Sequence, residues 1–364
     1  MKFIDEFRNR ELVRDIARRL AAIAGGPATI MEVCGTHTMA AARFGLKTLL
    51  PPGVELISGP GCPVCVTASP DLDAFLALGE RPGAILTTFG DMLRVPGSGG
   101  SLESRRAQGA DVRVVYSPLD AVELARQTPE ATVVFFGVGF ETTMPATAMA
   151  IRQAAAYDLG NFAVLCVHKT MPAALKALLA SGELRVSGLL CPGHVTTIIG
   201  AEAYDFIPRD FGLPCAVTGF EPVDMMLGIE ALLRQLKDGT ARVDNVYTRA
   251  VQVQANPRAR ELLEDVFAAS DSEWRGLGVI PGSGAAIREK YARFDARARF
   301  PEIWEQLAPT PPSACRCGEV LRGVLRPVQC PLFAKACSPA QPHGPCMVSG
   351  EGACAAAYRY EKAD

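Results

Sequence analysis

The sequence has no long hydrophobic run and no strong excess of charge of either sign. It contains no stretch of about eighteen consecutive apolar residues, so we expect no transmembrane helix. Residues 1–26 are charged throughout, which argues against a secretory signal. The net charge of −2, without a basic block or acidic tail, gives no electrostatic footprint for nucleic acid or an anionic membrane. We therefore expect a cytoplasmic protein that binds neither.

Common cofactor motifs are also missing. No G-x-x-x-x-G-K-[ST] loop occurs, so P-loop nucleotide hydrolysis has no support. The segment GVGFETTMP (137–145) lacks the third glycine of a dinucleotide fingerprint. A CxxxCxxC motif, which would indicate a radical-SAM cluster, is absent as well.

What the sequence does contain is a regular alternation of short apolar runs and helical stretches. The runs occupy 28–33, 54–58, 84–88, 112–116, 132–136, 162–167, 188–191 and 215–219. This alternation is typical of βαβ units, in which helices cover a parallel sheet. In such sheets ligands collect at the carboxyl ends of the strands, so we expect the functional loops there.

Three pairs of short motifs recur at a nearly constant offset. They are CGTHT (34–38) with CVHKT (166–170), GPGC (59–62) with CPGH (191–194), and TFGDM (88–92) with TGFEPVDMM (218–226). The pairs favour two related α/β domains that face each other. Chance matching of short motifs is the alternative.

Cysteine is abundant, and half of the twelve cysteines lie in the tail. In a reducing compartment such a count favours metal or redox chemistry over structural disulfides. The tail thiols are Cys315, Cys317, Cys330, Cys337, Cys346 and Cys354. One CxC followed by long single spacings suits a [4Fe–4S] cluster held by four thiolates better than zinc, which typically uses paired CxxC knuckles. Spacing does not choose the four, and zinc stays the alternative.

Cys62 and Cys65 form a CxxC motif just before a predicted helix, which Ser69 caps. The two thiols are close enough for a disulfide, and the helix N-terminus would lower the pKa of a thiolate. The motif therefore indicates a dithiol–disulfide switch. Half of a structural zinc site is the alternative, although no second CxxC accompanies it.

Cys34 ends a predicted strand, and His37 follows three residues later. This pair fits a nucleophile with its base or a soft iron site, although a thiol at a strand end is often merely buried. Glu141, at the mouth of a glycine-rich loop, is either a polar partner of the cysteines or a helix-capping carboxylate. We expect His168 and His194 to be cleft-lining or structural residues rather than metal ligands.

In combination, these motifs resemble those of the HypD family of [NiFe]-hydrogenase maturation factors, and they span residues 34 to 354. The resemblance implies a scaffold on which the Fe(CN)2(CO) centre is assembled, with redox-active thiols, rather than a conventional enzyme. The implied partners are HypC, which would share one iron with this chain, HypE, which would supply cyanide equivalents, and the hydrogenase large-subunit precursor, reached through HypC. A thiol–disulfide reductase like ferredoxin:thioredoxin reductase is the alternative function.

The resemblance also implies roles for individual residues. Cys34 would be the iron ligand, with His37 beside it, and Cys62 and Cys65 would be the dithiol of the cleft. An arrangement like that of ferredoxin:thioredoxin reductase is implied for the tail. There Cys315, Cys330, Cys337 and Cys354 would hold the [4Fe–4S] cluster, and Cys317 and Cys346 would be the exchangeable pair.

We therefore expect two related Rossmann-like parallel-sheet domains that face a cleft, and a loop-rich C-terminal iron–sulfur domain. The expected boundaries are an N-terminal helix over 1–27, a first α/β domain with the CGTHT and CPVC loops over 28–145, a second α/β domain over 146–240 and the [4Fe–4S] domain over 241–364. The tail beyond Cys315 is too poor in aliphatic residues to pack a core alone, so a metal or covalent staple is expected.

Overall fold

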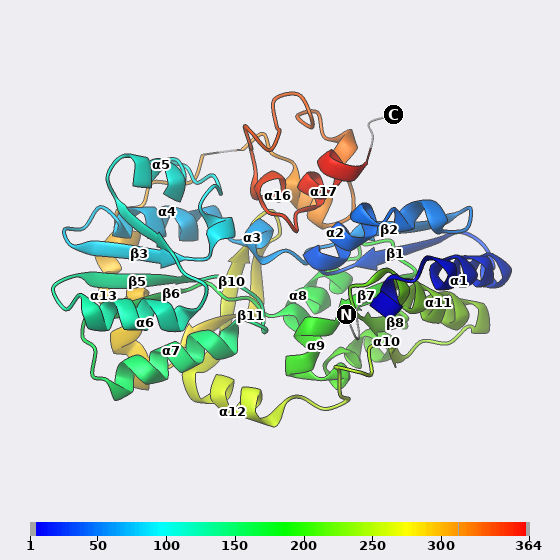
Figure 1. Cartoon of the computed structure of the whole chain (residues 1–364), viewed down its shortest axis with the longest axis horizontal. Coiled ribbons are helices and arrows are strands. Elements are labelled where there is room, and N and C mark those ends of the chain that lie inside the picture. The colour runs from blue at the N-terminus through cyan, green and yellow to red at the C-terminus, as the bar shows by residue number, and fades with distance from the viewer. Residues whose placement is uncertain (1–4, 312, 362–364) are drawn as a thin grey trace.

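Two parallel sheets form the two lobes of the molecule, and the C-terminal segment packs over the junction between them (Figure 1). The computed structural model describes residues 5–311 and 313–361. The five-stranded sheet has the order β2-β1-β7-β8-β9 and the four-stranded sheet the order β4-β3-β5-β6. All neighbouring strands in both sheets are parallel. The prediction of two parallel-sheet domains is confirmed.

The strands follow the predicted apolar runs closely. Those of the five-stranded sheet are β1 (Ala28–Glu32), β2 (Val54–Ser58), β7 (Gly188–Pro192), β8 (Cys215–Thr218) and β9 (Val243–Asn245). Those of the four-stranded sheet are β3 (Ala84–Thr88), β4 (Asp111–Val114), β5 (Thr132–Gly137) and β6 (Phe162–Cys166). Within these two sheets, β9 is the strand that was not expected, because its three residues are half-buried and leave no apolar run.

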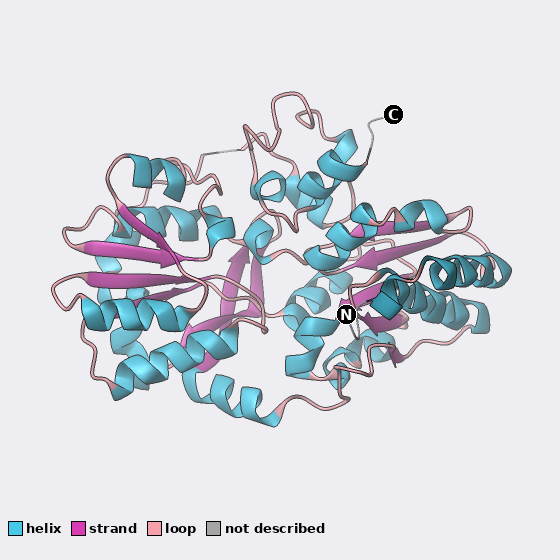
Figure 2. Cartoon of the chain, viewed as in Figure 1, coloured by secondary structure: helices cyan, strands magenta, loops and turns pink. Residues whose placement is uncertain are grey.

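Helices cover both sheets, as expected for βαβ units (Figure 2). They are α1 (Arg10–Ile23), α2 (Gly35–Arg43), α3 (Pro63–Val66), α4 (Ser69–Leu78), α5 (Leu102–Ala107), α6 (Pro118–Gln127), α7 (Met144–Ala156), α8 (Met171–Ala180), α9 (Gly193–Ile199), α10 (Phe206–Phe211), α11 (Pro222–Asp238), α12 (Pro257–Val266), α13 (Ala296–Arg299) and α14 (Pro301–Glu305). Short 3-10 helices are η1 (Asp5–Arg8), η2 (Leu46–Leu49), η3 (Gly90–Met92), η4 (Ala201–Tyr204) and η5 (Glu289–Phe294). Among the described helices, none combines the length and hydropathy that a bilayer span requires.

The N-terminal helix α1 packs against α11 through one apolar face. Val13, Ile16 and Leu20 recur at helical spacing and are buried in the core of the five-stranded lobe. Asn9 caps the helix, since its side chain accepts the backbone N–H groups of Glu11 and Leu12. Residues 1–4 of the predicted N-terminal helix lie outside the described residues.

The two sheets do not divide at the predicted boundary at residue 145. Strands β1 and β2 share a sheet with β7 and β8, which come more than a hundred residues later. The two groups of strands join where β1 pairs with β7, and the chain between them builds the four-stranded sheet. The physical reason is that β7 pairs with the free edge of β1. This pairing extends the sheet that β1 and β2 begin. GPGC and CPGH lie at the carboxyl ends of β2 and β7 in the same sheet. The other two motif pairs, CGTHT with CVHKT and TFGDM with TGFEPVDMM, each lie at strands of different sheets.

The segment after residue 240 contains more regular structure than expected. An antiparallel hairpin of β10 (Phe267–Trp274) and β11 (Gly278–Ile287) packs on α8, and α12 packs on α7. Loops dominate only beyond residue 312, around α15 (Cys317–Leu321), η6 (Pro327–Gln329), α16 (Pro345–Val348) and α17 (Ala353–Tyr360) (Figure 2). This part of the chain is the loop-rich C-terminal region that the sequence predicted.

Candidate functional site

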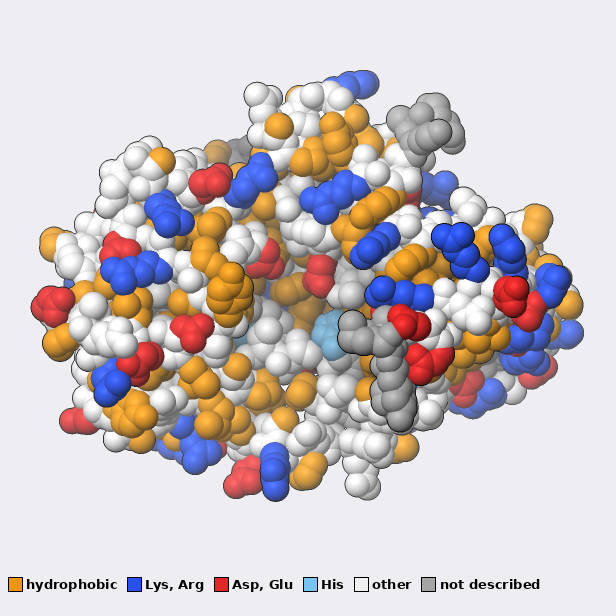
Figure 3. All heavy atoms as spheres, in the orientation of Figure 1, with side chains coloured by type: hydrophobic (Ala, Val, Ile, Leu, Met, Phe, Trp, Pro, Cys, Tyr) orange, Lys and Arg blue, Asp and Glu red, His pale blue; other side chains and the backbone are white. Residues whose placement is uncertain are grey.

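A cleft lies between the two sheets, where the carboxyl ends of strands from both lobes meet. Its cavity measures about 410 Å³ and is lined by the loops that follow β1, β2, β3, β5, β7 and β8. Glu351 of the tail also lines it. The space-filling view shows this hollow at the centre of the molecule, with acidic side chains along one edge and a histidine inside (Figure 3). The location agrees with the rule that ligands collect at strand carboxyl ends.

Cys34 is the N-cap residue of α2 and lies beside His194, one of the residues that line the cleft. Its side chain is 2 % exposed, and its backbone N–H donates to Oε2 of Glu32 at 3.1 Å. Burial raises the pKa of the Cys34 thiol well above its usual value. The backbone amides of His37 and Thr36 act in the opposite direction, because they lie in the first turn of α2 and favour the thiolate.

The histidine beside Cys34 is His194, not His37. The distance from Sγ of Cys34 to Nδ1 of His194 is 3.9 Å. The ring of His37 instead lies 2.9 Å through Nε2 from the carbonyl oxygen of Gly219 and packs on Phe220. Burial lowers the pKa of both histidines to about 4, so both rings are neutral at physiological pH and could serve as ligands or hydrogen-bond partners.

From the sequence we expected His194 to be a cleft-lining or structural residue, and in the structure it lines the cleft. Its closeness to Cys34 follows from sheet order, because β1 and β7 are neighbours and their carboxyl ends open side by side. A signal was present, since CPGH also follows a strand. The pairing of strands far apart in the chain was not visible in the sequence.

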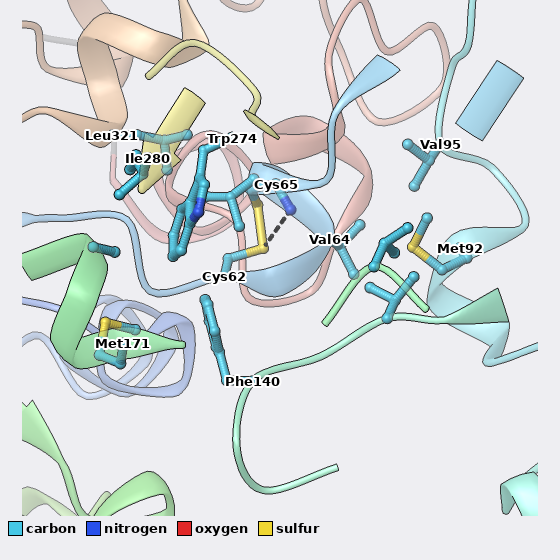
Figure 4. Close-up of a cluster of buried hydrophobic side chains, with 14 of the residues drawn as sticks. Cys62, Val64, Cys65, Met92, Val95, Phe140, Met171, Trp274, Ile280 and Leu321 are labelled. Atoms are coloured by element: carbon cyan, nitrogen blue, oxygen red, sulfur yellow. Dashed lines mark hydrogen bonds between the residues drawn. A yellow bond between two sulfur atoms is a disulfide. The ribbon is translucent and has the colours of Figure 1, made fainter. Parts of the chain in front are cut away.

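Cys62 and Cys65 form a disulfide at the start of α3, on the cleft side of the five-stranded sheet. The proximity predicted for these two thiols is confirmed. The backbone N–H of Cys65 donates to Sγ of Cys62 at 3.1 Å. Figure 4 shows the rings of Trp274, from β10, and Phe140, from the loop after β5, near the disulfide. The centroids of these two rings are 5.9 Å apart, and both residues share a buried cluster with Cys62 and Cys65.

The Cys34 loop and the Cys62 loop are in direct backbone contact. The backbone N–H of Gly35 donates to the carbonyl oxygen of Gly61 at 2.9 Å. A Cβ atom on Gly61 would overlap the backbone N and Cα of Cys34, so only glycine allows this approach. The two loops are thus held side by side by backbone that admits no side chain between them.

Glu141 lies close to the start of α8 rather than beside the cysteines. Its Oε1 accepts the backbone N–H of Met171, the first residue of α8, at 2.8 Å. Its Oε2 is buried without a hydrogen-bond partner, and burial raises the pKa of the carboxyl to about 7. Of the two readings offered by the sequence, the geometry favours the helix-capping carboxylate.

The tail thiols lie close to one another. A hydrogen bond with Cys315 lowers the pKa of Cys317, and one with Cys346 raises it. Burial is the main cause of the raised pKa of Cys354, and the charges of Cys315, Cys317, Cys337 and Cys330 raise it further. These mutual effects require the sulfurs to lie near each other. Soft thiolate donors of this number fit an iron–sulfur cluster by their chemistry. In the part of the chain that the structure describes, no group of three or more ligand side chains is arranged to hold a single metal ion.

The tail is docked directly on both cysteine loops of the cleft. Helix α17 packs on α2, and α16, which carries Cys346, packs on α3, which carries Cys65. Oγ1 of Thr36 donates to Oε1 of Glu351 at 2.6 Å. A Cβ atom on Gly35 would lie 2.5 Å from Cβ of Glu351 and 3.2 Å from Cβ of Cys62. The sulfur-rich tail and the cleft therefore form one continuous site.

Comparison with known proteins agrees with this arrangement. The model of the HypD family, described as "Hydrogenase formation hypA family", matches residues 9–361. "Hydrogenase maturation factor HypD" of Azotobacter vinelandii is 48% identical over 369 residues, which is 99% of this chain and 97% of the relative. The protein of the same name from Escherichia coli (strain K12) is 47% identical over 370 residues, 100% of this chain and 99% of the relative. The chain therefore belongs to the HypD family.

Proposed function

We propose that this chain acts in the maturation of [NiFe]-hydrogenase, as the scaffold that holds iron together with HypC while the Fe(CN)2(CO) centre is assembled. The family membership supports the maturation role. The observation that carries the proposal is the meeting of the Cys34 thiol, the ring of His194 and the Cys62–Cys65 disulfide at one cleft formed by both lobes. HypE would deliver the cyanide equivalents to this cleft.

Cys34 would bind the iron, which is the cargo of the scaffold. A thiolate is a soft ligand that suits low-spin Fe(II) carrying cyanide and carbon monoxide. The buried thiol has a raised pKa, so the proton must leave when the metal binds. Nδ1 of His194 lies 3.9 Å from the sulfur, and burial lowers the pKa of this ring to about 4, so the neutral ring could accept a hydrogen bond from the thiol or contact the bound iron.

The tail would carry the resident [4Fe–4S] cluster. By resemblance to the family, Cys315, Cys330, Cys337 and Cys354 would hold it, and Cys317 and Cys346 would be the exchangeable pair. When bound, such a cluster supplies electrons one at a time at low potential. Cys317 lies within hydrogen-bonding reach of both Cys315 and Cys346, which suits a pair that changes partners.

The cleft disulfide would be the acceptor of these electrons. Its reduction requires two electrons, delivered singly by a low-potential donor protein through the tail, and two protons, and it yields the Cys62 and Cys65 thiols. The packing of α16 on α3 brings the helix of Cys346 against that of Cys65. This contact also favours the second candidate function, a thiol–disulfide reductase that acts on a protein disulfide.

Infrared spectroscopy of the anaerobically co-purified complex with HypC separates the two functions. The scaffold carries the stretching bands of bound cyanide and carbon monoxide, whereas a plain reductase has no reason to carry them. We expect Cys34→Ala to abolish these bands. The matched control is Cys166→Ala, which removes a thiol that ends a strand of the other sheet and donates to the carbonyl oxygen of Ala285. Full band intensity in Cys34→Ala would overturn the assignment.

A further inference from the structure

Cys34 is the N-cap residue of α2, yet its side chain does not cap the helix. An N-cap side chain ordinarily accepts a backbone N–H from the first turn of its helix, and this bond holds it in place. Within the described residues, the side chain of Cys34 makes no such capping bond. Its sulfur lies instead 3.9 Å from Nδ1 of His194. The position of the thiol therefore depends on how the backbone of Cys34 is held.

Glu32 holds the backbone of Cys34 on both sides. It is the last residue of β1, and its side chain is buried, at 1 % exposure. Its Oε2 accepts the backbone N–H of Cys34 at 3.1 Å, and its Oε1 accepts the hydroxyl of Thr38. Oγ1 of Thr38 also lies 3.4 Å from the carbonyl oxygen of Cys34. One buried carboxyl thus reaches the N–H of Cys34 directly and its C=O through Thr38.

The carboxyl of Glu32 is not the partner of a cation. In the part of the chain that the structure describes, the two other buried carboxyls of this lobe, Asp224 and Glu230, pair with arginines, whereas Glu32 forms no ion pair. Lys47, whose charge acts on it, is paired with Glu361. A buried carboxyl is costly unless its oxygens are hydrogen-bonded. Glu32 meets that need with donors of the Cys34 loop.

The counterpart of this loop, CVHKT (166–170), differs at the equivalent position. The residue two positions before its cysteine is Val164, which has no acceptor on its side chain. The thiol of Cys166 donates to the carbonyl oxygen of Ala285 at 3.0 Å, so that sulfur is held by its own hydrogen bond to the backbone. The carboxyl therefore accompanies the loop whose sulfur faces another side chain in the cleft.

We propose that Glu32 is a positioning residue that holds Cys34 by hydrogen bonds, so that the thiol lies beside His194 and can bind the iron. The inference rests on the proposed function, in which Cys34 is the iron ligand. The hydrogen bonds, rather than the charge of the carboxyl, position the thiol. In Glu32→Gln the new Oε1 can accept the Cys34 N–H while Nε2 donates to Oγ1 of Thr38. The Thr38 hydroxyl then donates to the carbonyl oxygen of Cys34.

The test compares Glu32→Met, which removes both acceptors at a similar side-chain length, with Glu32→Gln, which keeps the hydrogen bonds. Glu230→Met is the matched control, because it also removes a buried carboxyl from the five-stranded lobe, one whose partners are Arg19 and Arg234. The first readout is the iron of the anaerobically co-purified complex with HypC, corrected for the iron that accompanies acid-labile sulfide. The second is hydrogen exchange of the Cys34 amide in the full chain without HypC, followed by mass spectrometry.

In Glu32→Met we expect the sulfide-free iron to fall about tenfold and the Cys34 amide to exchange about tenfold faster, because this N–H loses its acceptor. Glu32→Gln should stay within about twofold of wild type in both readouts, since it keeps an acceptor and a donor. Glu230→Met should lower the melting temperature and leave both readouts at the wild-type level. Wild-type iron or wild-type exchange in Glu32→Met would overturn the proposal, and so would an equal loss in Glu32→Gln or Glu230→Met.

A folding failure and a failure of the proposed function give different results. If Glu32→Met does not fold, as judged by its thermal transition, Thr38→Val removes the hydroxyl that links the carboxyl to the Cys34 carbonyl oxygen. It should lower the sulfide-free iron about threefold, and Thr38→Ser should restore it. Wild-type iron in Thr38→Val would then overturn the proposal. If the wild-type complex holds no sulfide-free iron, the proposed function fails, while exchange of the Cys34 amide still decides whether Glu32 fixes this residue.

Discussion

Gly61 is the position where a single methyl group should separate the two cysteine loops. A Cβ atom there would overlap the backbone N and Cα of Cys34. Because both are backbone atoms, no change of rotamer relieves the collision, and one loop has to move. The hydrogen bond from the Gly35 N–H to the Gly61 carbonyl, 2.9 Å long, would be strained or broken by that movement.

The expected loss of folding stability follows from the backbone collision and from the hydrogen bond that it breaks. Overpacking of a well-packed site costs about 1–3 kcal/mol, and a rigid backbone collision belongs at the upper end of that range. Loss of the inter-loop hydrogen bond adds about 1 kcal/mol. We therefore expect Gly61→Ala to lower the melting temperature by several degrees. We also expect it to prevent iron retention at Cys34, because the displaced thiol no longer lies beside His194.

The matched control is Gly160→Ala, whose new Cβ atom meets open space at an ordinary backbone φ. It should be neutral or slightly stabilising, by about 0.4–1 kcal/mol, because alanine restricts the unfolded chain. Circular dichroism melting and the iron content of the anaerobic complex with HypC measure both effects. Wild-type melting and wild-type iron in Gly61→Ala would refute the close approach of the two loops.

The remaining predictions concern the tail, the buried carboxyl and the contact between tail and cleft. Cys337→Ser should lose the broad visible absorption of thiolate-bound iron and sulfide, and an unchanged spectrum would remove Cys337 from the ligands. Glu141 has a pKa raised from 4.5 to about 7, so its contribution to stability is present below pH 4.5 and is lost as the pH rises towards 7. Glu141→Gln should therefore gain melting temperature relative to wild type between pH 5 and pH 8, and a pH-independent difference would contradict this. Thr36→Val should cost about 0.5–1.5 kcal/mol by breaking the hydrogen bond to Glu351, and Thr36→Ser should restore it in the same melting assay.

Local patterns predicted the strands of the fold well, because a fully buried parallel strand needs a continuous apolar run. All eight predicted runs became strands, and α4 is the helix that was predicted after the CxxC motif. The division of strands between sheets was not predictable in the same way. It depends on β7 pairing with β1 across a long stretch of chain, and no local feature of either strand encodes that partner. The β10–β11 hairpin was missed because β10 is mostly half-buried or exposed and neither strand contains a dense apolar run.

The candidate site was predicted in its residue types more than in its contacts. Cys34, Cys62 and Cys65 meet at the cleft because each follows a strand of one sheet, and that position was readable from the motifs. His194 was not identified as the neighbour of Cys34, since its closeness arises from sheet order.

The central claim is that reduced sulfur on this chain binds iron at the tail and at Cys34. Iron and acid-labile sulfide analysis of the anaerobically purified chain, alone and with HypC, tests it most directly. We expect roughly four iron and four sulfide per chain from the tail, and one further iron without sulfide in the complex. Protein that contains neither iron nor sulfide, both as purified and after reconstitution, would contradict it.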